Sequence, residues 1–151
     1  NQSPFNLGSS SNTIVLGNNS IQNAYCKVAW TVTSDERMKT NIEPLQFNSL
    51  DYINGLQTKQ YNMNNPQDYI DEGIDNNGSL MDQNKSIGFI SQDVKLLEDS
   101  MLPNEIVSNT QNPDNYGVRY TAIIPILVDA MQKQQVMIDN LLNRIELLEN
   151  N

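Results

Sequence analysis

The chain has 151 residues, with 9 Lys and Arg against 18 Asp and Glu, a net charge of −9, one cysteine and no histidine. The lack of histidine excludes Ser-His and Cys-His catalytic sites and His-liganded metal sites, and a lone cysteine can form neither an intrachain disulfide nor a zinc site of paired cysteines. The acidic balance argues against nucleic acid, whose phosphates are bound by Lys and Arg, and no apolar run approaches the roughly 18 residues of a membrane span, so we predict no metal, cofactor, nucleic-acid partner or membrane partner.

The first 33 residues are rich in Ser, Asn and Gly and carry few charges. Two short strands are predicted there, at residues 13–16 and 26–33, the second because apolar and more polar side chains alternate along it. Cys26 and Trp30 share the face of this strand that is expected to be buried. Two such strands cannot form a core by themselves, so this zone is interpreted as the end of something larger or as strands completed by other chains.

Residues 34–120 mix signals for short helices and short strands, which predicts an α+β region. A helix is expected over 49–56, where apolar residues recur at helical spacing and Ser49 is placed as the cap. A second helix is expected over 91–97, with Ser91 as its cap and acidic Asp93 in its first turn.

Strands are predicted at residues 60–63, 86–90, 106–107 and 116–120. The Asn-, Asp- and Gly-rich residues 64–85 are interpreted as a protruding hairpin loop. A calcium loop around Gly78 is rejected, because Gly73 and Asn84 stand where the first ligand and the bidentate Glu are required.

The last zone predicts a long helix over about 121–150. Its seam residues recur at alternating spacings of three and four, which is a heptad pattern: Ile124, Leu127, Met131, Gln134, Ile138, Leu141, Ile145 and Leu148. A helix of this length has little of its own chain to pack against, so self-association is predicted, although an amphipathic helix on the domain's own core is the alternative. Ile at a and Leu at d lean toward two strands, so the pattern leaves the number of strands open.

One segment offers a nucleophile and a base without histidine. A turn would bring the Lys39 amine back to the Ser34 hydroxyl, and Arg37 would supply a like charge that favours the neutral amine needed in a general base. Because Ser34 follows the Thr33 carbonyl, its hydroxyl could attack its own preceding peptide bond, shift the Thr33 acyl group from nitrogen to oxygen and leave an ester for water to hydrolyse. By spacing alone this pair is a weak signal, and the favoured interpretation is that Ser34 is a helix cap and Lys39 a solvated side chain.

Three blocks of sequence, in order, resemble the blocks of one known family: residues 34–42 (SDERMKTNI), 88–94 (GFISQDV) and 120–127 (YTAIIPIL). The family they resemble is peptidase S74, the intramolecular chaperone domains at the C-termini of phage endosialidase tailspikes, tail fibres and neck appendages. Residues 34–42 (SDERMKTNI) are similar to the family's S-D-x-R-x-K-x-N-I opening. Residues 88–94 (GFISQDV) are similar to its G-F-I-A-Q-E-V block, with Ser91 and Asp93 in place of Ala and Glu, and residues 120–127 resemble the tyrosine-led start of its terminal helix.

The resemblance implies an α+β fold of short strands, hairpins and small helices, ending in a helix that forms a parallel trimeric coiled coil. Residues 1–33 would be the C-terminal β end of the parent fibre, 34–120 the chaperone and autoprotease domain, and 121–151 the coiled-coil helix. The partner would be two further copies of the chain, and the substrate its own N-terminal fibre segment. Assembly is expected in the host cytoplasm, with the parent tail fibre or tailspike in the virion.

Carried over by position, Ser34 would be the nucleophile and Lys39 the general base of a serine endopeptidase that turns over once in cis. The break would fall between Thr33 and Ser34, and Asp35, Arg37 and Asn41 would have supporting roles. If the geometry of Ser34 and Lys39 forms only in the assembled trimer, cleavage becomes a checkpoint on assembly.

Two other functions stay open. The first is a trimerisation domain of a fibre protein in which the Ser-Lys pair is misplaced and no cleavage occurs. The second is a relative of the membrane-bound myelin regulatory factor, in which cleavage frees a DNA-binding segment. The Ser- and Asn-rich strands before Ser34 do not resemble such a segment, which argues against the second.

Overall fold

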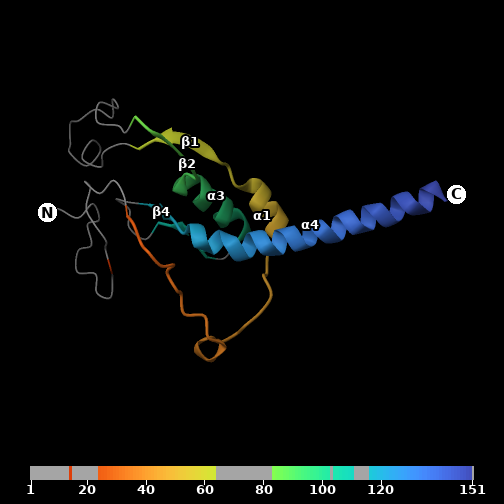
Figure 1. Cartoon of the computed structure of the whole chain (residues 1–151), viewed down its shortest axis with the longest axis horizontal. Coiled ribbons are helices and arrows are strands. Elements are labelled where there is room, and N and C mark those ends of the chain that lie inside the picture. Colours follow the sequence, from red (N-terminus) through yellow and green to blue (C-terminus); the bar gives the residue numbers. More distant parts are fainter. Residues whose placement is uncertain (1–13, 15–23, 64–82, 103, 111–115, 151) are drawn as a thin grey trace. The chain divides into compact units, whose positions relative to one another are not determined.

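The computed structural model describes residues 14, 24–63, 83–102, 104–110 and 116–150. By their contacts, the residues divide into two compact units, 1–43 with 60–86, and 44–59 with 87–151. Figure 1 labels the helices and strands along the chain. Short strands, small helices and a long C-terminal helix confirm the α+β class, whereas the boundaries at 33/34 and 120/121 stay predictions.

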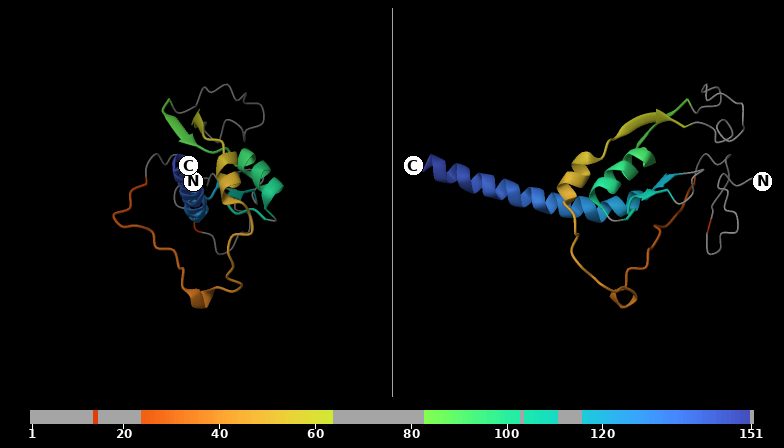
Figure 2. Two further views of the ribbon diagram at one scale, coloured as in Figure 1. Left: turned by 90° about the vertical axis from the view of Figure 1, so that its right-hand side faces the viewer. Right: turned by 180° about the vertical axis from the view of Figure 1, so that it is seen from behind.

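The second unit is built from helices around a small antiparallel sheet. Its elements are α1 (Ser49–Gly55), α3 (Ser91–Met101), β3 (Ser108–Asn109), β4 (Gly117–Val118) and α4 (Tyr120–Glu149). In the sheet, Ser108 lies opposite Val118 and Asn109 opposite Gly117. α1 packs beside the first half of α4, α3 packs against α1 and the small sheet, and the second half of α4 extends past α1 (Figures 1 and 2).

The hydrophobic core of this unit lies where the three helices meet the sheet. Four side chains are buried at its centre: Tyr52 of α1, Val94 of α3, Ile126 of α4, and Val107 just before β3. Gly55 lets α1 approach α3 closely, because a Cβ atom there would lie 2.6 Å from Cδ1 of Leu97. The partly buried side chains around the centre are Phe47, Ile53, Leu56, Phe89, Leu97, Met101, Leu102, Val118, Ala122 and Ile123.

A second small sheet is formed by β1 (Lys59–Asn62) and β2 (Lys85–Gly88), which pair with each other. This confirms the strands predicted at 60–63 and 86–90 to within two residues. Most of the predicted hairpin loop, residues 64–82, lies outside the described residues, as does the calcium motif that was rejected there.

The three predicted helices are confirmed, but both predicted serine caps are wrong. Asn48 caps α1, since its side chain accepts a hydrogen bond from Leu50 N, and Ser49 is instead fully buried and bonded to Lys133 of α4. α3 has Ile90 at its N-cap without a side-chain bond, and the Ser91 hydroxyl donates to the carbonyl of Gly117 at 2.6 Å. Both serine hydroxyls therefore bond to residues distant in sequence and do not cap their own helices.

The strand predicted at 106–107 forms two residues later, as β3. The reason is that the backbone N–H groups of Ile106 and Val107 donate to the side chain of Glu98 and not to a neighbouring strand. The strand predicted at 116–120 is confirmed in part, as the shorter β4.

The strand predicted at 26–33 is not formed, and the predicted burial of its apolar face is wrong for the single chain. Trp30 is 77% exposed and Cys26 is also exposed. An alternating pattern specifies which face a strand would bury, but the strand itself needs a partner backbone, and the described residues supply none here. Of the predicted strand at 13–16 only Ile14 lies within the described residues, and it is exposed.

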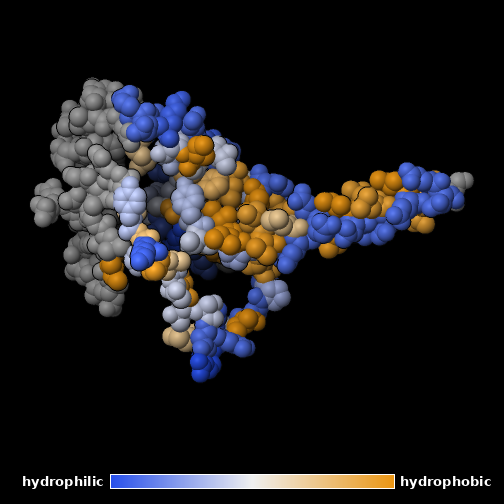
Figure 3. Space-filling model, in the orientation of Figure 1, coloured by the Kyte–Doolittle hydropathy of each residue, from blue (hydrophilic) through white to orange (hydrophobic). Residues whose placement is uncertain are grey.

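α4 presents two apolar faces. One face turns toward the core of its own unit and consists of Ala122, Ile123, Ile126 and Ala130. The other is the predicted seam from Ile124 to Leu148, whose residues are exposed and, apart from the polar Gln134, apolar. Figure 3 shows hydrophobic surface over the first half of α4 that continues in patches along its projecting end. Pro125 lies in the second turn and not in the first, where a proline is best tolerated, and it leaves the exposed Thr121 carbonyl without its helical donor.

Candidate active site

A short turn lies at the start of the region singled out by the sequence. Residues Glu36–Met38 form the 3-10 helix η1, in which Met38 N donates to Asp35 O and Lys39 N to Glu36 O. Asp35 is its N-cap, because Oδ1 accepts from Arg37 N at 2.9 Å. The turn reverses the chain between residues 34 and 39, so it sets where the Lys39 side chain can reach.

The structure brings Ser34 and Lys39 together within a single chain. Lys39 Nζ lies 2.7 Å from Ser34 Oγ and 3.0 Å from the Ser34 carbonyl oxygen, and it donates to both. Both residues are exposed, as is Thr33 on the other side of the candidate bond. The contact has the length required for proton transfer, whereas the catalytic roles of the two residues stay predictions.

Arg37 does not face Lys39 as an unpaired charge. Its guanidinium forms a forked contact with the Asp35 carboxylate, with Nε 2.9 Å from Oδ1 and Nη2 2.5 Å from Oδ2. The side-chain bond and the backbone bond from Arg37 lower the pKa of Asp35, and the carboxylate raises the pKa of Arg37. The predicted repulsion of Lys39 by Arg37 is therefore offset by Asp35.

Asn41 ends the segment with a φ of 52°, in the left-handed region. Asparagine tolerates this conformation better than other residues that carry a Cβ. The predicted supporting role of Asn41 therefore has a local basis, in the direction that the chain takes after Lys39.

The second and third resembling blocks meet in the other unit. The Tyr120 hydroxyl accepts from Phe89 N at 3.0 Å, and the two rings stack with centroids 5.8 Å apart. Two residues further along, Ser91 bonds to Gly117 just before α4. Residues 88–94 thus hold the start of α4 in place.

A family model decides the family of this part of the chain. Residues 34–105 match Peptidase_S74, described as the chaperone of endosialidase. This segment belongs to that family. None of the curated proteins matches the chain. The match confirms the family predicted from the first two blocks, and the third block lies beyond the matched residues.

Peptidase_S74 is a family of self-cleaving peptidases, and membership implies a chaperone role in the assembly of a fibre protein. Among the described residues, no group of three potential ligands is placed to hold a metal ion. Within the same part of the chain, none of the helices has the length and apolar character required to cross a membrane.

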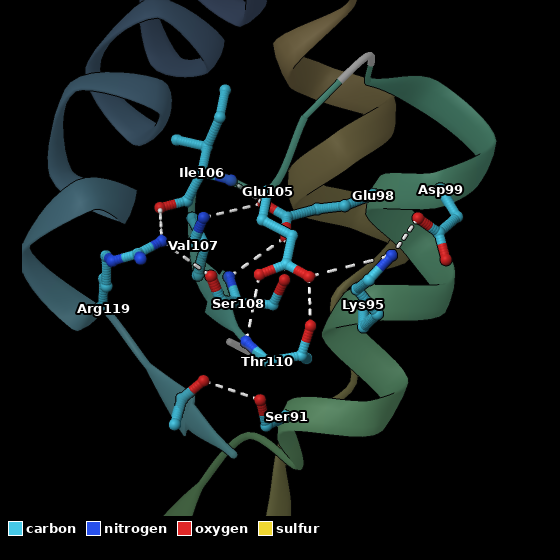
Figure 4. Close-up of polar contacts among 11 residues, drawn as sticks. Ser91, Lys95, Glu98, Asp99, Glu105, Ile106, Val107, Ser108, Thr110 and Arg119 are labelled. Carbon is cyan, nitrogen blue, oxygen red and sulfur yellow. Dashed lines mark hydrogen bonds and ion pairs between the residues drawn. The ribbon is translucent and has the colours of Figure 1, made fainter. Parts of the chain in front are cut away.

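The Peptidase_S74 segment also contains a buried carboxylate that the sequence analysis missed. Glu98 of α3 is 1% exposed and accepts hydrogen bonds from the backbone N–H groups of Ile106, Val107 and Ser108, which follow α3 (Figure 4). It also accepts from the hydroxyls of Ser108 and Tyr52. One signal was available, because Glu98 falls at the inward-facing spacing of Val94 and Met101 on α3.

The charge of Glu98 is stabilised by these donors. Burial acts to raise the pKa of its carboxyl, but the bonds from Ser108, Val107 and Ile106 outweigh burial, so that the pKa is lowered. Burial and the nearby Glu98 charge raise the pKa of the Tyr52 hydroxyl, which keeps it protonated as a donor. Arg119 holds the other side of the same segment through the carbonyls of Ser108 and Ile106.

We expect Glu98→Ala to destabilise the fold by about 3 kcal/mol or more, because it leaves several buried donors without an acceptor. Asp99→Ala, next to it on α3 but exposed in an ion pair with Lys95, should cost less than about 1 kcal/mol. Thermal unfolding of the two variants at equal protein concentration checks this. Since the folded pKa of Glu98 is lowered, its contribution is complete above the usual carboxyl range and is lost as pH falls through the folded value. Equal midpoints for the two variants would contradict the role assigned to Glu98.

Proposed function

We propose that this chain is the intramolecular chaperone of a viral tail fibre or tailspike, that it joins three chains through α4, and that it then releases itself by cleaving the Thr33–Ser34 bond. The contact of Lys39 Nζ with Ser34 Oγ is the observation that carries the cleavage. The exposed seam of α4 supports the assembly. Assembly in the host cytoplasm and a parent fibre in the virion belong to the same proposal.

In the proposed reaction, a neutral Lys39 amine takes the proton of Ser34 Oγ as that oxygen attacks the Thr33 carbonyl carbon. The resulting ammonium gives the proton to the Ser34 nitrogen as the C–N bond breaks. The Thr33 acyl group then forms an ester with Ser34 Oγ. Water hydrolyses the ester, which leaves a carboxylate on Thr33 and a free amino group and hydroxyl on Ser34.

Ser34 and Lys39 are exposed to water in the single chain, so the other chains could promote cleavage by covering them. A general base must be in its neutral form, because a protonated amine cannot accept the hydroxyl proton. Desolvation favours the neutral amine. In our proposal, neighbouring chains of the trimer exclude water from Ser34 and Lys39, which makes cleavage depend on assembly although the two side chains already touch.

The two faces of α4 support a bundle of identical helices. Successive residues of an α-helix are turned by about 100°, so the seam residue Leu127 lies about 100° around the helix from Ile126 and about 60° from Ala130, the residues that pack on the core. Ile124, Leu127 and Met131 are 60%, 42% and 60% exposed beside that packed face. The domain's own core therefore leaves the seam uncovered, against the alternative that α4 merely covers its own domain.

The width of the exposed stripe favours three strands. Val128 and Leu142 at e positions and Met137 at a g position flank the seam and are about half exposed. A helix in a trimer contacts two neighbours, so both flanks are covered. In a dimer the flanks stay largely in water.

A charged pair supports the parallel orientation. Arg144 falls at a g position and Glu149 at the e position five residues later, and both are exposed. In a parallel, in-register coiled coil, a g residue faces the e residue of the next heptad on the adjacent helix. Each interface of the proposed trimer would therefore hold one such ion pair.

We expect Arg144→Glu to lower the thermal midpoint of the assembled trimer by a few degrees at low salt, since it places like charges across every interface. Glu149→Arg should do the same. The double exchange, Arg144→Glu with Glu149→Arg, should restore the midpoint because it re-forms the pair with opposite polarity. Additive losses in the double variant would contradict the parallel register.

The test of the proposed function is the mass of the purified chain. Cleavage predicts a fragment whose mass corresponds to a start at Ser34, together with the released residues that precede it. An uncleaved mass in a trimeric sample would favour the alternative, an assembly domain that does not cut.

A further inference from the structure

The contact between Ser34 and Lys39 depends on a turn without hydrophobic support. η1 contains no buried residue, and the two backbone bonds of the turn join Asp35 to Met38 and Glu36 to Lys39. A three-residue 3-10 helix has poor hydrogen-bond geometry and is held by its surroundings. The described contacts that hold η1 are therefore local and polar.

Asp35 makes most of these contacts. Its Oδ1 accepts from Arg37 N, which would otherwise be an unpaired donor at the start of the turn, and both oxygens hold the Arg37 guanidinium. The Asp35 side chain is not among the groups within hydrogen-bond distance of Ser34 Oγ or Lys39 Nζ in the described residues. Asp35 therefore has no path to the reacting proton in this geometry, but it controls the turn that presents Lys39.

We propose that Asp35 is a positioning residue for the self-cleavage reaction, which acts by capping η1 through the backbone N–H of Arg37 and thereby holds Lys39 Nζ against Ser34 Oγ. This inference rests on the proposed function. The negative charge of Asp35 is not what positions Lys39, because the carboxylate is paired with the Arg37 guanidinium. The property that matters is a side-chain oxygen placed to accept from the start of the turn.

Substitutions that separate the cap from the charge test this role. Asn and Ser are good N-cap residues without a negative charge, and Ala cannot cap. Asp35→Ala should slow self-cleavage about fivefold. Asp35→Asn and Asp35→Ser should cleave within about twofold of the unchanged chain. Glu36→Ala, which removes the adjacent exposed carboxylate, is the matched control and should not alter the rate.

A second measurement does not need cleavage. In the whole chain with Ser34→Ala, amide hydrogen exchange at Met38 and Lys39 should become faster with Asp35→Ala and stay unchanged with Asp35→Asn, because these amides make the bonds of the turn. Slow cleavage in Asp35→Asn would overturn the proposal, as it would assign the effect to the charge. Unchanged exchange in Asp35→Ala would also overturn it. Failure of the unchanged chain to cleave would instead count against the proposed function, while exchange still reports on the cap.

Discussion

Ser34→Ala is expected to abolish self-cleavage and leave the chain whole, because no other hydroxyl can reach the Thr33 carbonyl through the same short ring. Lys39→Met should slow the reaction by about 10²- to 10⁴-fold, the usual contribution of a general base. Lys39→Arg should be as slow as Lys39→Met. Arginine keeps the charge and the ability to donate to Ser34 Oγ but does not give up its proton in proteins.

Denaturing gels and intact masses of the purified variants provide the measurement. Lys27→Arg, at an exposed lysine in the residues before the candidate bond, is the matched control and should cleave normally. All variants should keep the same oligomeric state by light scattering, because none lies on α4. Cleavage at the same bond in Ser34→Ala would rule out Ser34 as the nucleophile, and fast cleavage in Lys39→Arg would rule out Lys39 as the base.

The double variant Ile138→Asp with Leu141→Asp is expected to convert the trimer to monomers and to suppress cleavage at neutral pH. Both residues lie on the seam and are exposed in the single chain. Their burial in a bundle stabilises it by on the order of 1.5–3 kcal/mol for each large apolar side chain, and a carboxylate in the seam removes this gain and adds repulsion between chains. Light scattering and denaturing gels of the same sample measure assembly and cleavage together.

The matched control for this variant is Asn140→Asp with Asn143→Asp. These substitutions add the same charge to the same stretch of α4, but at c and f positions that face away from the seam. We expect the control to stay trimeric and to cleave. Full cleavage by the monomeric seam variant would end the checkpoint hypothesis, and loss of assembly in the control would point to net charge and not to the seam.

The checkpoint hypothesis changes in one respect. A geometry that forms only in the trimer was one condition for it, yet Ser34 and Lys39 are in contact within one chain. Their sequence separation is only five residues, and η1 closes that distance with local bonds. In the proposed function, the step left to assembly is therefore the removal of water from the pair.

Local patterns in the sequence predicted the parts of the fold that depend on nearby residues. The heptad spacing located α4 to within a residue at each end, and two short runs on either side of an Asn-, Asp- and Gly-rich segment located β1 and β2. The proximity of Ser34 and Lys39 was also accessible, because a turn spans it. The family's motifs, and not the spacing, gave the pair a chemical role.

Features that depend on distant residues could not be predicted in the same way. Glu98 looks like a solvated residue of a short helix until a segment eight to ten residues away folds over it. Ser49 and Ser91 suit a cap locally, but Lys133 and Gly117 compete for their hydroxyls. Residues 26–33 have the composition of a strand, and the described chain provides no edge on which it could form.

The packing of α4 has a consequence for the order in which chains join. Initiating an isolated helix is unfavourable, since several residues must be fixed before the first bond forms. In this chain the folded domain has already initiated α4, because Ile126 and Ala130 pack the first turns of the helix against the domain. In the proposed trimer, coiling would therefore proceed from the domain toward the C-terminus, so the earliest encounter between chains would also fix their alignment.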